Sequence, residues 1–463
     1  MRPQNMSRET LGSGLGFILL SAGSAIGIGN VWKFPWLCGQ NGGAWFVLVY
    51  LFFLVILGLP VMTMEFAVGR AAHRSPIGMF QALERPGERW HWWGWVCLAG
   101  STLLMMFYTT VSGWMLLYFW KLANGTFSGL DALAVKQAFG ACLADPVQQV
   151  CAMAVVVAAG FGVCALGLRG GLERTTKWMM LGLLAIMAVL AGHSLSLDGA
   201  FSGLAFYLRP SAAIVREVGL WKVIVNAMNQ AFFTLSLGIG CLAIFGSYIG
   251  RDHSLPSESV RITALDTAVA LISGLIIFPA CASFGVEADA GPSLIFVTLP
   301  NIFSHLPLGR LWGALFFVFL GAAAFTTVLA TFENLVACVK ELTGWSRPVV
   351  CAVDFVVLLL LSLPCALGFN LWANFQPFGA GSGVLDLEDF ILSNLLLPIG
   401  ALVFILFCAT RWKAYLAEAN AGRGFHFPAD GLLGRLFRAY CTWLLPLLVL
   451  ALLLIGLWTR FAC

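Results

Sequence analysis

Residues 21–35 read SAGSAIGIGNVWKFP and lie inside the first long apolar segment of the chain. Three glycines fall within seven residues of this stretch, and Asn30 and Lys33 follow them. Glycine weakens a helix, and an amide or an ammonium at membrane depth is costly unless it finds partners. Irregular backbone at that depth is tolerated only where it is buried in protein or lines a cavity. The stretch therefore predicts an interrupted helix beside a polar cavity, although glycine and serine also form close-packing faces between membrane helices.

The composition is that of an integral membrane protein. Of 463 residues, 60% are hydrophobic and 10% are charged, with a mean hydropathy of +0.90, whereas soluble domains carry about 25% charged residues. A membrane-spanning helix needs about 20 apolar residues. We therefore expect an all-α integral membrane protein of about eleven transmembrane helices. These are expected near 14–38, 43–67, 91–120, 149–168, 177–196, 220–248, 260–284, 309–338, 349–369, 386–410 and 437–459.

The distribution of lysine and arginine predicts the orientation in the membrane. Cytoplasmic segments carry an excess of these residues, and with a cytoplasmic N-terminus they hold 18 of the 26. An odd number of helices then leaves the C-terminus outside. The first 13 residues are too polar for a signal peptide, and the short termini favour a prokaryotic plasma membrane. The net charge of +4 follows from this loop bias and indicates no nucleic-acid binding.

Cysteine usage indicates no metal centre. Most of the 13 cysteines lie in apolar segments, where cysteine behaves as a small core residue, and no spacing typical of a metal site occurs. Cys142 and Cys151 fall near an outer loop and could form a disulfide. The sequence specifies no oligomeric state.

A second segment repeats the unusual chemistry of the first. Residues 232–240 read FFTLSLGIG and lie inside the sixth apolar segment. Interrupted helices at corresponding positions of two halves point to a transporter binding site. We therefore predict a single transporter domain over 1–463, with inverted five-helix repeats at 14–196 and 220–410 and an additional helix at 437–459.

Several motifs occur in order along most of the chain. They are GSAIGIGNVWKFP (23–35), NGGA (41–44), Pro60, Glu65, Gly69-Arg70, FFTLSLGIG, Ser247-Tyr248, Thr326-Thr327 and GWSR (344–347). In this order they resemble the neurotransmitter:sodium symporter family, most of all its bacterial branch that transports leucine and other hydrophobic amino acids. The resemblance implies a symporter, not an enzyme, that alternates between outward-open and inward-open states.

The resemblance implies two sodium sites built from free carbonyls and polar side chains. The first would use the Ala25 carbonyl, Asn30, Thr234 and Asp266, and the substrate carboxylate would complete it. The second would use the carbonyls of Gly23, Ile26 and Ala323 and the hydroxyls of Thr326 and Thr327. Outside this family context, a threonine pair in a helix is more often bonded back to its own backbone.

Asp266 bears on the choice of ions. Many relatives have Asn at this position, and the chloride-dependent ones have Ser four residues later, where this chain has Ala270. Tyr50, Gln230 and Thr234 match the rest of the chloride site. A fixed carboxylate would supply the negative charge that chloride otherwise brings, so we predict chloride-independent transport. The alternative is that Asp266 takes up a proton during the empty return step, which would give proton antiport.

The resemblance also implies an amino-acid pocket between the two interrupted helices. The amides of Ile28 and Gly29 and the Tyr108 hydroxyl would bind the carboxylate, since half-helix N-termini favour anions. The amino group would be bound by carbonyls of Ser24, Phe233 and Thr234 and by the Ser236 hydroxyl, and Ala25 would belong to both the ion and the substrate contacts. The side chain would contact Ile28, Leu104, Phe233, Ile239, Thr327 and Thr331.

This pocket predicts the class of substrate. Its lining is mostly apolar, so a charged side chain would lack a partner. Gly27 stands where amine-transporting relatives have Asp, so no carboxylate is offered to a substrate that lacks its own. We therefore expect a neutral, hydrophobic L-amino acid rather than a monoamine, with another small zwitterion as the alternative.

Gates are expected on both sides of the pocket. Phe233 and Tyr108 would form a lid, with an outer ion pair between Lys33 and Asp389. Most relatives have Arg at position 33, and Lys cannot make the bidentate pair with a carboxylate, so we expect a weaker outer gate. Arg8 and Glu341 would form the inner latch, with Tyr248 nearby.

Two further expectations concern the scaffold. Related bacterial members unwind helix five at a proline to release the second sodium ion, but no proline occurs in 147–209. Release would then need another route, such as melting near Gly170, Gly171 or Gly182. Glu65, in the second helix, is expected to accept hydrogen bonds from the interrupted sixth helix.

Three other classes of protein compete with a symporter. A sodium channel should show a continuous polar stripe or a ring of charges, and only isolated polar positions occur at mid-depth. An intramembrane protease should pair Ser with His or Asp with Asp inside the membrane, yet all six histidines fall at helix ends or in loops. A non-transporting amino-acid sensor of the same fold would use the same ligands as a transporter.

Overall fold

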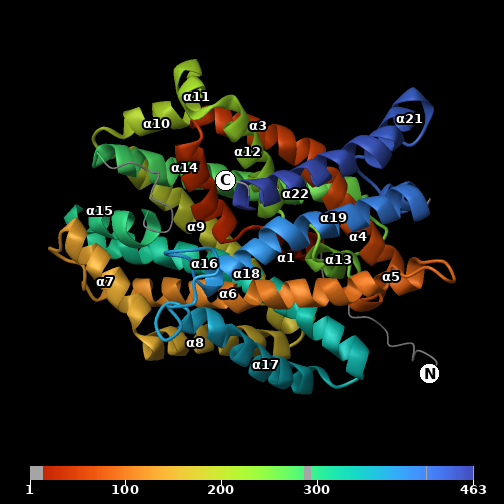
Figure 1. Cartoon of the computed structure of the whole chain (residues 1–463), viewed down its shortest axis with the longest axis horizontal. Coiled ribbons are helices and arrows are strands. Elements are labelled where there is room, and N and C mark those ends of the chain that lie inside the picture. Colours follow the sequence, from red (N-terminus) through yellow and green to blue (C-terminus); the bar gives the residue numbers. More distant parts are fainter. Residues whose placement is uncertain (1–13, 286–293, 413, 462–463) are drawn as a thin grey trace.

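The computed structural model describes residues 14–285, 294–412 and 414–461, and these form a bundle of helices (Figure 1). Within these ranges no β-strand occurs, apart from an isolated bridge between His253 and Arg423. Nine helices of the described residues are long and apolar enough to cross a membrane, and a bent pair makes a tenth. The all-α membrane fold expected from the sequence is therefore confirmed.

The first span is interrupted where its glycines predict. Helix α1 (Gly14–Ala25) stops, a π-helical turn η1 (Gly29–Lys33) and α2 (Phe34–Gln40) continue, and the two pieces meet at 57°. The break lies at residues 26–28, the IGI of the quoted stretch.

The sixth span is interrupted over a longer stretch. Helix α12 (Leu220–Thr234) ends, and α13 (Cys241–Gly246) begins only after residues 235–240. Ser236, Gly238 and Gly240 have φ values of 50°, 101° and 75°. These angles lie in the left-handed region that glycine tolerates best, which explains two glycines in the motif. When this broken span is added to the ten counted above, the total equals the eleven helices expected from the sequence.

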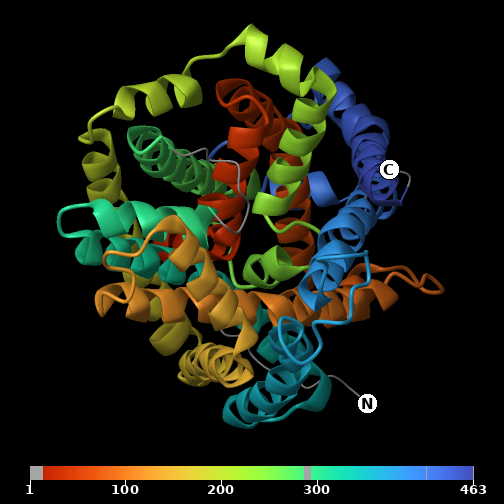
Figure 2. The same ribbon diagram turned by 60° about the vertical axis from the view of Figure 1, so that its left-hand side comes forward.

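The remaining spans surround these two. They are α3–η2–α4 (Ala44–Phe53, Leu54–Gly58, Leu59–Ala72), α6 (Trp92–Ala123), α8 (Pro146–Ala165), η3–α9 (Leu168–Glu173, Arg174–Leu195), α14 (Leu255–Ser283), α16 (Gly309–Thr343), α17 (Arg347–Leu367), α18–η5–α19–η6 (Val384–Phe390, Ile391–Leu396, Leu397–Leu406, Phe407–Arg411) and α21–η7–α22 (Gly431–Ala439, Tyr440–Leu444, Leu445–Phe461). Helix α1 packs on α9, α14 and α16, and both broken spans lie inside the bundle (Figure 2). The fifth span, which lacks proline, carries the π-helical turn η3 around Gly170 and Gly171.

Short helices between the spans were not predicted. They are α5 (Pro76–Leu83), α7 (Ala132–Ala144), α10 (Ala200–Leu208), α11 (Ala212–Val218), η4 (Leu294–Thr298), α15 (Leu299–His305) and α20 (Tyr415–Ala419). The disulfide considered for Cys142 and Cys151 is not formed, because both cysteines are free. Cys142 is buried, and its carbonyl accepts a hydrogen bond from Gln149 Nε2 at 2.8 Å.

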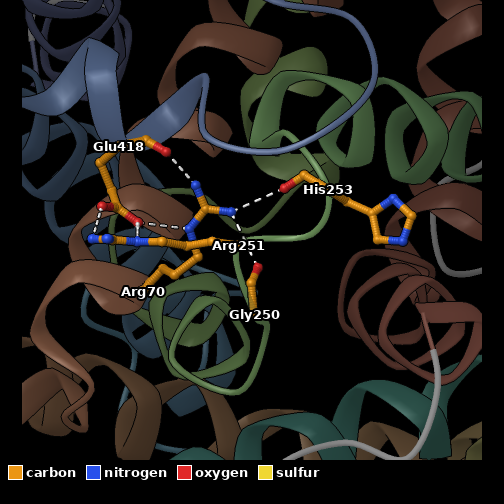
Figure 3. A network of polar contacts seen from close by, with 5 residues as sticks. All are labelled: Arg70, Gly250, Arg251, His253 and Glu418. Atoms are coloured by element: carbon orange, nitrogen blue, oxygen red, sulfur yellow. Dashed lines mark hydrogen bonds and ion pairs between the residues drawn. The ribbon is translucent and has the colours of Figure 1, made fainter.

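One ion-pair network ties the segment after the tenth span to the rest of the bundle (Figure 3). Arg70, at the end of α4, is 1% exposed, and its Nε lies 2.8 Å from Glu418 Oε1 in α20. Its Nη1 donates to the carbonyls of Gly250 and His253, in the loop that follows α13. Arg251 contacts the same Glu418 carboxylate. A single guanidinium thus connects α4, the end of the broken sixth span and α20.

Candidate substrate and ion site

The amides of the first interruption have polar partners. Gly27 N donates to Asn30 Oδ1 at 3.1 Å, and Ile28 N donates to the Tyr108 hydroxyl at 3.0 Å. Amides at the end of a broken helix favour anions. In the structure these two amides are satisfied by side chains of predicted site residues.

The carbonyls of the same segment face helix α16. Thr327 Oγ1 lies within hydrogen-bond distance of Gly23 O at 3.3 Å and Ile26 O at 3.2 Å. Thr326 Oγ1 donates to Ala323 O at 2.9 Å and approaches Ile26 O at 3.4 Å. Five oxygens predicted for the second sodium site therefore converge between α1 and α16.

Asn30, Thr234 and Asp266 form a second polar group. Asn30 Nδ2 donates to Asp266 Oδ1 at 2.8 Å and to its carbonyl at 3.2 Å, while Thr234 Oγ1 donates to Asp266 Oδ2 at 3.2 Å. Each of the three is at most 2% exposed. The side chains predicted for the first sodium site thus come together from three separate spans.

A single cavity lies against both polar groups. Its twelve lining residues are Ala25, Gly27, Gly29, Leu104, Tyr108, Phe233, Thr234, Ser236, Ile239, Thr327, Leu392 and Leu397. Nine of the predicted substrate contacts are among them. The other three predicted contacts, Ser24, Ile28 and Thr331, are buried but do not line it.

For two of these three residues, the structure shows why the side chain does not line the cavity. Ile28 approaches the site through its backbone amide, which donates to Tyr108. Thr331 lies one turn along α16, and its hydroxyl donates to Thr327 O at 3.0 Å. Leu392 and Leu397 of the tenth span line the cavity but were missed, because nothing distinguishes them from other leucines of an apolar segment.

Gly27 leaves no room for a side chain. A Cβ atom built here would lie 2.3 Å from the Tyr108 hydroxyl and 2.7 Å from Thr327 Oγ1. Any larger residue would therefore displace the two hydroxyls that cap the first interruption.

A carboxylate stabilises the second interruption. Glu65 Oε1, in α4, accepts a short hydrogen bond from Gly238 N, so the hydrogen bond expected from the sequence is confirmed. A Cβ atom at Gly238 would lie 2.2 Å from Leu397 O, and one at Gly400 would lie 2.0 Å from Gly238 O. The backbone of residues 235–240 therefore packs directly against the backbone of the tenth span.

The expected outer ion pair is not formed in this conformation. Lys33 Nζ lies 3.7 Å above the centre of the Phe233 ring, a cation–π contact. Asp389 instead accepts a hydrogen bond from Ser393 at 2.7 Å. Near Lys33, Phe296 packs edge-on against Trp32 and Trp114.

Only one of the two residues of the predicted inner latch lies within the described residues. Arg8 lies outside the described residues, whereas Glu341 accepts hydrogen bonds from Ser75 N and Oγ at 2.8 and 2.6 Å. The Tyr248 hydroxyl donates to Glu333 at 2.8 Å, and Glu333 also pairs with Arg347. The sequence analysis missed Glu333, which lies two residues beyond the predicted Thr331.

The fold and the site define a class of protein. Two interrupted helices inside an apolar bundle place backbone carbonyls and amides, bonded to side chains, around one cavity, which is the architecture of a secondary transporter. No cluster of three or more His, Cys, Asp or Glu suited to a metal ion occurs within the described ranges. The chain belongs to the Sodium:neurotransmitter symporter family, whose pattern matches residues 8–129 and 131–390. It is therefore a multi-pass, sodium-coupled membrane transporter and not an enzyme.

Individual relatives extend along nearly the whole chain. The sodium-dependent transporter YhdH of Bacillus subtilis is 34% identical over 421 residues, which cover 90% of this chain and 92% of YhdH. A sodium-dependent transporter of Haemophilus influenzae is 29% identical over 417 residues, 88% of this chain and 90% of that protein. The crystal structure of MhsT in complex with L-phenylalanine superposes with a TM-score of 0.85 at 36% identity and covers 97% of this chain and 100% of MhsT.

Proposed function

We propose that this protein imports a neutral, hydrophobic L-amino acid together with sodium, without a requirement for chloride, by alternating access. One observation carries the proposal. Tyr108, whose hydroxyl accepts from the Ile28 amide, and Thr234, which belongs to the Asn30–Thr234–Asp266 group, line the same cavity. A carboxylate bound to the amide and hydroxyl would lie beside the group that binds the cation, so each ligand would favour binding of the other.

Two sodium ions are proposed. The first would be bound by the Ala25 carbonyl, Asn30, Thr234 and Asp266, and the second by the oxygens that converge on Thr326 and Thr327. Hard cations prefer oxygen ligands, and each group brings together oxygens from separate spans. Filling both sites would therefore favour the occluded state of the bundle.

The cavity favours an apolar side chain. Away from its polar end, its lining is Leu104, Ile239, Leu392 and Leu397, and a charge placed among them would lack a partner. Gly27 offers no counter-charge to an amine. The MhsT structure contains L-phenylalanine, a neutral hydrophobic amino acid, which supports the same class here.

Asp266 supports independence from chloride. Its carboxylate accepts hydrogen bonds from Asn30 and Thr234, which favour the ionised form, so Asp266 would supply a negative charge to the proposed sodium ion. Ala270, four residues further on, offers no hydroxyl to an anion. Proton uptake by Asp266 on the empty return step is the second possibility, and it predicts that a proton gradient drives counter-transport.

The orientation and the membrane are also proposals. The excess of Lys and Arg supports a cytoplasmic N-terminus and an outer C-terminus, and the bacterial relatives support a prokaryotic plasma membrane. Lys33, Phe233 and Phe296 would then lie on the outer side of the pocket, and Glu341 and Tyr248 on the inner side.

The decisive experiment is uptake into proteoliposomes under an imposed sodium gradient. Neutral amino acids from alanine to tryptophan are each supplied as radiolabelled substrate, with gluconate replacing chloride in a parallel series. We expect accumulation of apolar amino acids in both series. Binding without accumulation would instead indicate a sensor, accumulation of another zwitterion would overturn the substrate class, and a chloride requirement at neutral pH would overturn the role of Asp266.

A further inference from the structure

The tenth span supplies a wall of the substrate cavity. Leu392 and Leu397 line the cavity together with Gly29, Tyr108 and Thr234, and they are only 1% and 2% exposed. We propose that these two leucines form the surface that selects the size of the substrate side chain. This proposal rests on the function proposed above. It assigns the selection among amino acids to the tenth span, which lies outside the two interrupted helices.

A π-helical turn makes this wall possible. Residues five apart in an α-helix point about 140° away from each other, because each residue turns the helix by about 100°. Here η5 spans Ile391–Leu396, and Leu397 N donates to Leu392 O across the wider turn. The wider turn brings both leucines to the same cavity, as π turns at functional sites often do.

Close backbone packing holds the wall in place. Gly238 and Gly400 approach so closely that a Cβ atom on either would lie 2.2 Å or less from backbone of the other element. The tenth span therefore cannot move away from residues 235–240 without losing this contact. A larger substrate must fit against Leu397 rather than push the helix outward.

The position of Ile239, another residue that lines the cavity, also depends on a small residue. A Cβ atom at Gly100, in α6, would lie 3.0 Å from Ile239 Cγ2 and 3.6 Å from Leu396 Cδ1. Gly100 thus gives Ile239 room to lie back from the cavity. Leu392, Leu397 and Ile239 therefore line the cavity together, with Gly100 packed against Ile239.

Variants that change each wall test the proposal. Sodium-dependent binding of L-valine, L-leucine, L-phenylalanine and L-tryptophan is measured on the purified full chain. Leu397→Ala and Leu392→Ala should raise the affinity for tryptophan relative to valine by about tenfold, the scale on which a few methylenes discriminate. Leu397→Phe and Gly100→Ala should shift this ratio in the opposite direction. Leu406→Ala, at a position 40% exposed on α19, is the matched control and should leave the ratio unchanged.

Two results would overturn the inference, and they differ from failure of the proposed function. If the wild type and all variants bind with the same tryptophan-to-valine ratio, the tenth span does not select size. If Leu406→Ala changes the ratio as much as Leu397→Ala, the effect is a general loosening of α19. If the wild type binds none of the four amino acids, the proposed function itself fails. Thermal unfolding of every variant shows whether a change in ratio comes from a folded protein.

Discussion

The two interrupted helices are stabilised in different ways. At the first break, the amides of Gly27 and Ile28 are satisfied by Asn30 and Tyr108, residues that belong to the proposed ligand site. At the second break, Gly238 is satisfied by Glu65, a carboxylate of α4 that does not line the cavity. Positive φ angles at Ser236, Gly238 and Gly240 give the second break its shape.

This difference suggests a division of labour. The polar partners of the first break can be exchanged for a substrate carboxylate and a cation, so its conformation should depend on what is bound. The second break is preorganised by the protein and should be rigid whether or not ligand is present. The following variants test that division.

Asn30→Ala should have the largest effect on the first break. It removes the partner of Gly27 N and leaves the buried Asp266 carboxylate without its shortest hydrogen bond. Losing a hydrogen bond to a charged group costs about 1.5–3 kcal/mol, so sodium affinity should fall by up to about 100-fold. Sodium titration of amino-acid binding measures this, and Asn226→Ala, which removes a hydrogen bond to Asn41 away from the cavity, is the control. Unchanged sodium affinity in Asn30→Ala would show that the first ion site lies elsewhere.

Gly238→Ala should damage the second break in every condition. The added methyl group meets Leu397 O at 2.2 Å, and φ is 101°, so strain and overpacking should cost about 3 kcal/mol or more. Thermal unfolding should show a large loss of stability that neither sodium nor amino acid restores. Gly162→Ala, where an added methyl group meets nothing within 4 Å, is the matched control. Wild-type stability of Gly238→Ala would contradict the close packing.

Glu65→Ala should destabilise the second break by a smaller amount. A buried amide without an acceptor costs about 1–3 kcal/mol, and Gly238 N would be left in this state. Glu65→Gln keeps a carbonyl acceptor, so it should unfold close to the wild-type temperature. Equal stability of the two variants would show that the hydrogen bond to Gly238 contributes nothing.

Tyr108→Phe should have the smallest effect on stability and the clearest response to ligand. It removes the hydroxyl that accepts from Ile28 N, so substrate affinity should fall by about tenfold. Because a bound carboxylate can satisfy the freed amide, saturating sodium and amino acid should restore the lost stability. If ligand restores Glu65→Ala as fully as Tyr108→Phe, the two breaks do not differ as proposed.

Much of this arrangement could be predicted from the sequence, because polar and glycine residues stand out in apolar segments. Both breaks and the hydrogen bond that Glu65 accepts involve such residues, and the Asn30–Thr234–Asp266 group was expected from the resemblance to the family. Leu392 and Leu397 could not be predicted, because a π turn depends on backbone geometry that leucine does not signal. Lys33 likewise carried the right charge for an ion pair, but its contact with Phe233 depends on tertiary packing. Apolar connecting helices such as α7 and α15 were not predicted because they are too short to be recognised as spans.

The Arg70 network has a consequence for the synthesis of this protein. Arg70 is made early, its carbonyl acceptors at Gly250 and His253 follow near the middle of the chain, and its carboxylate partner Glu418 emerges close to the end. A buried charge without its partner is strongly destabilising. A nascent or truncated chain that stops before residue 418 therefore leaves this guanidinium without a counter-ion. The contact that fastens α20 to the bundle can therefore form only in a chain that extends past residue 418.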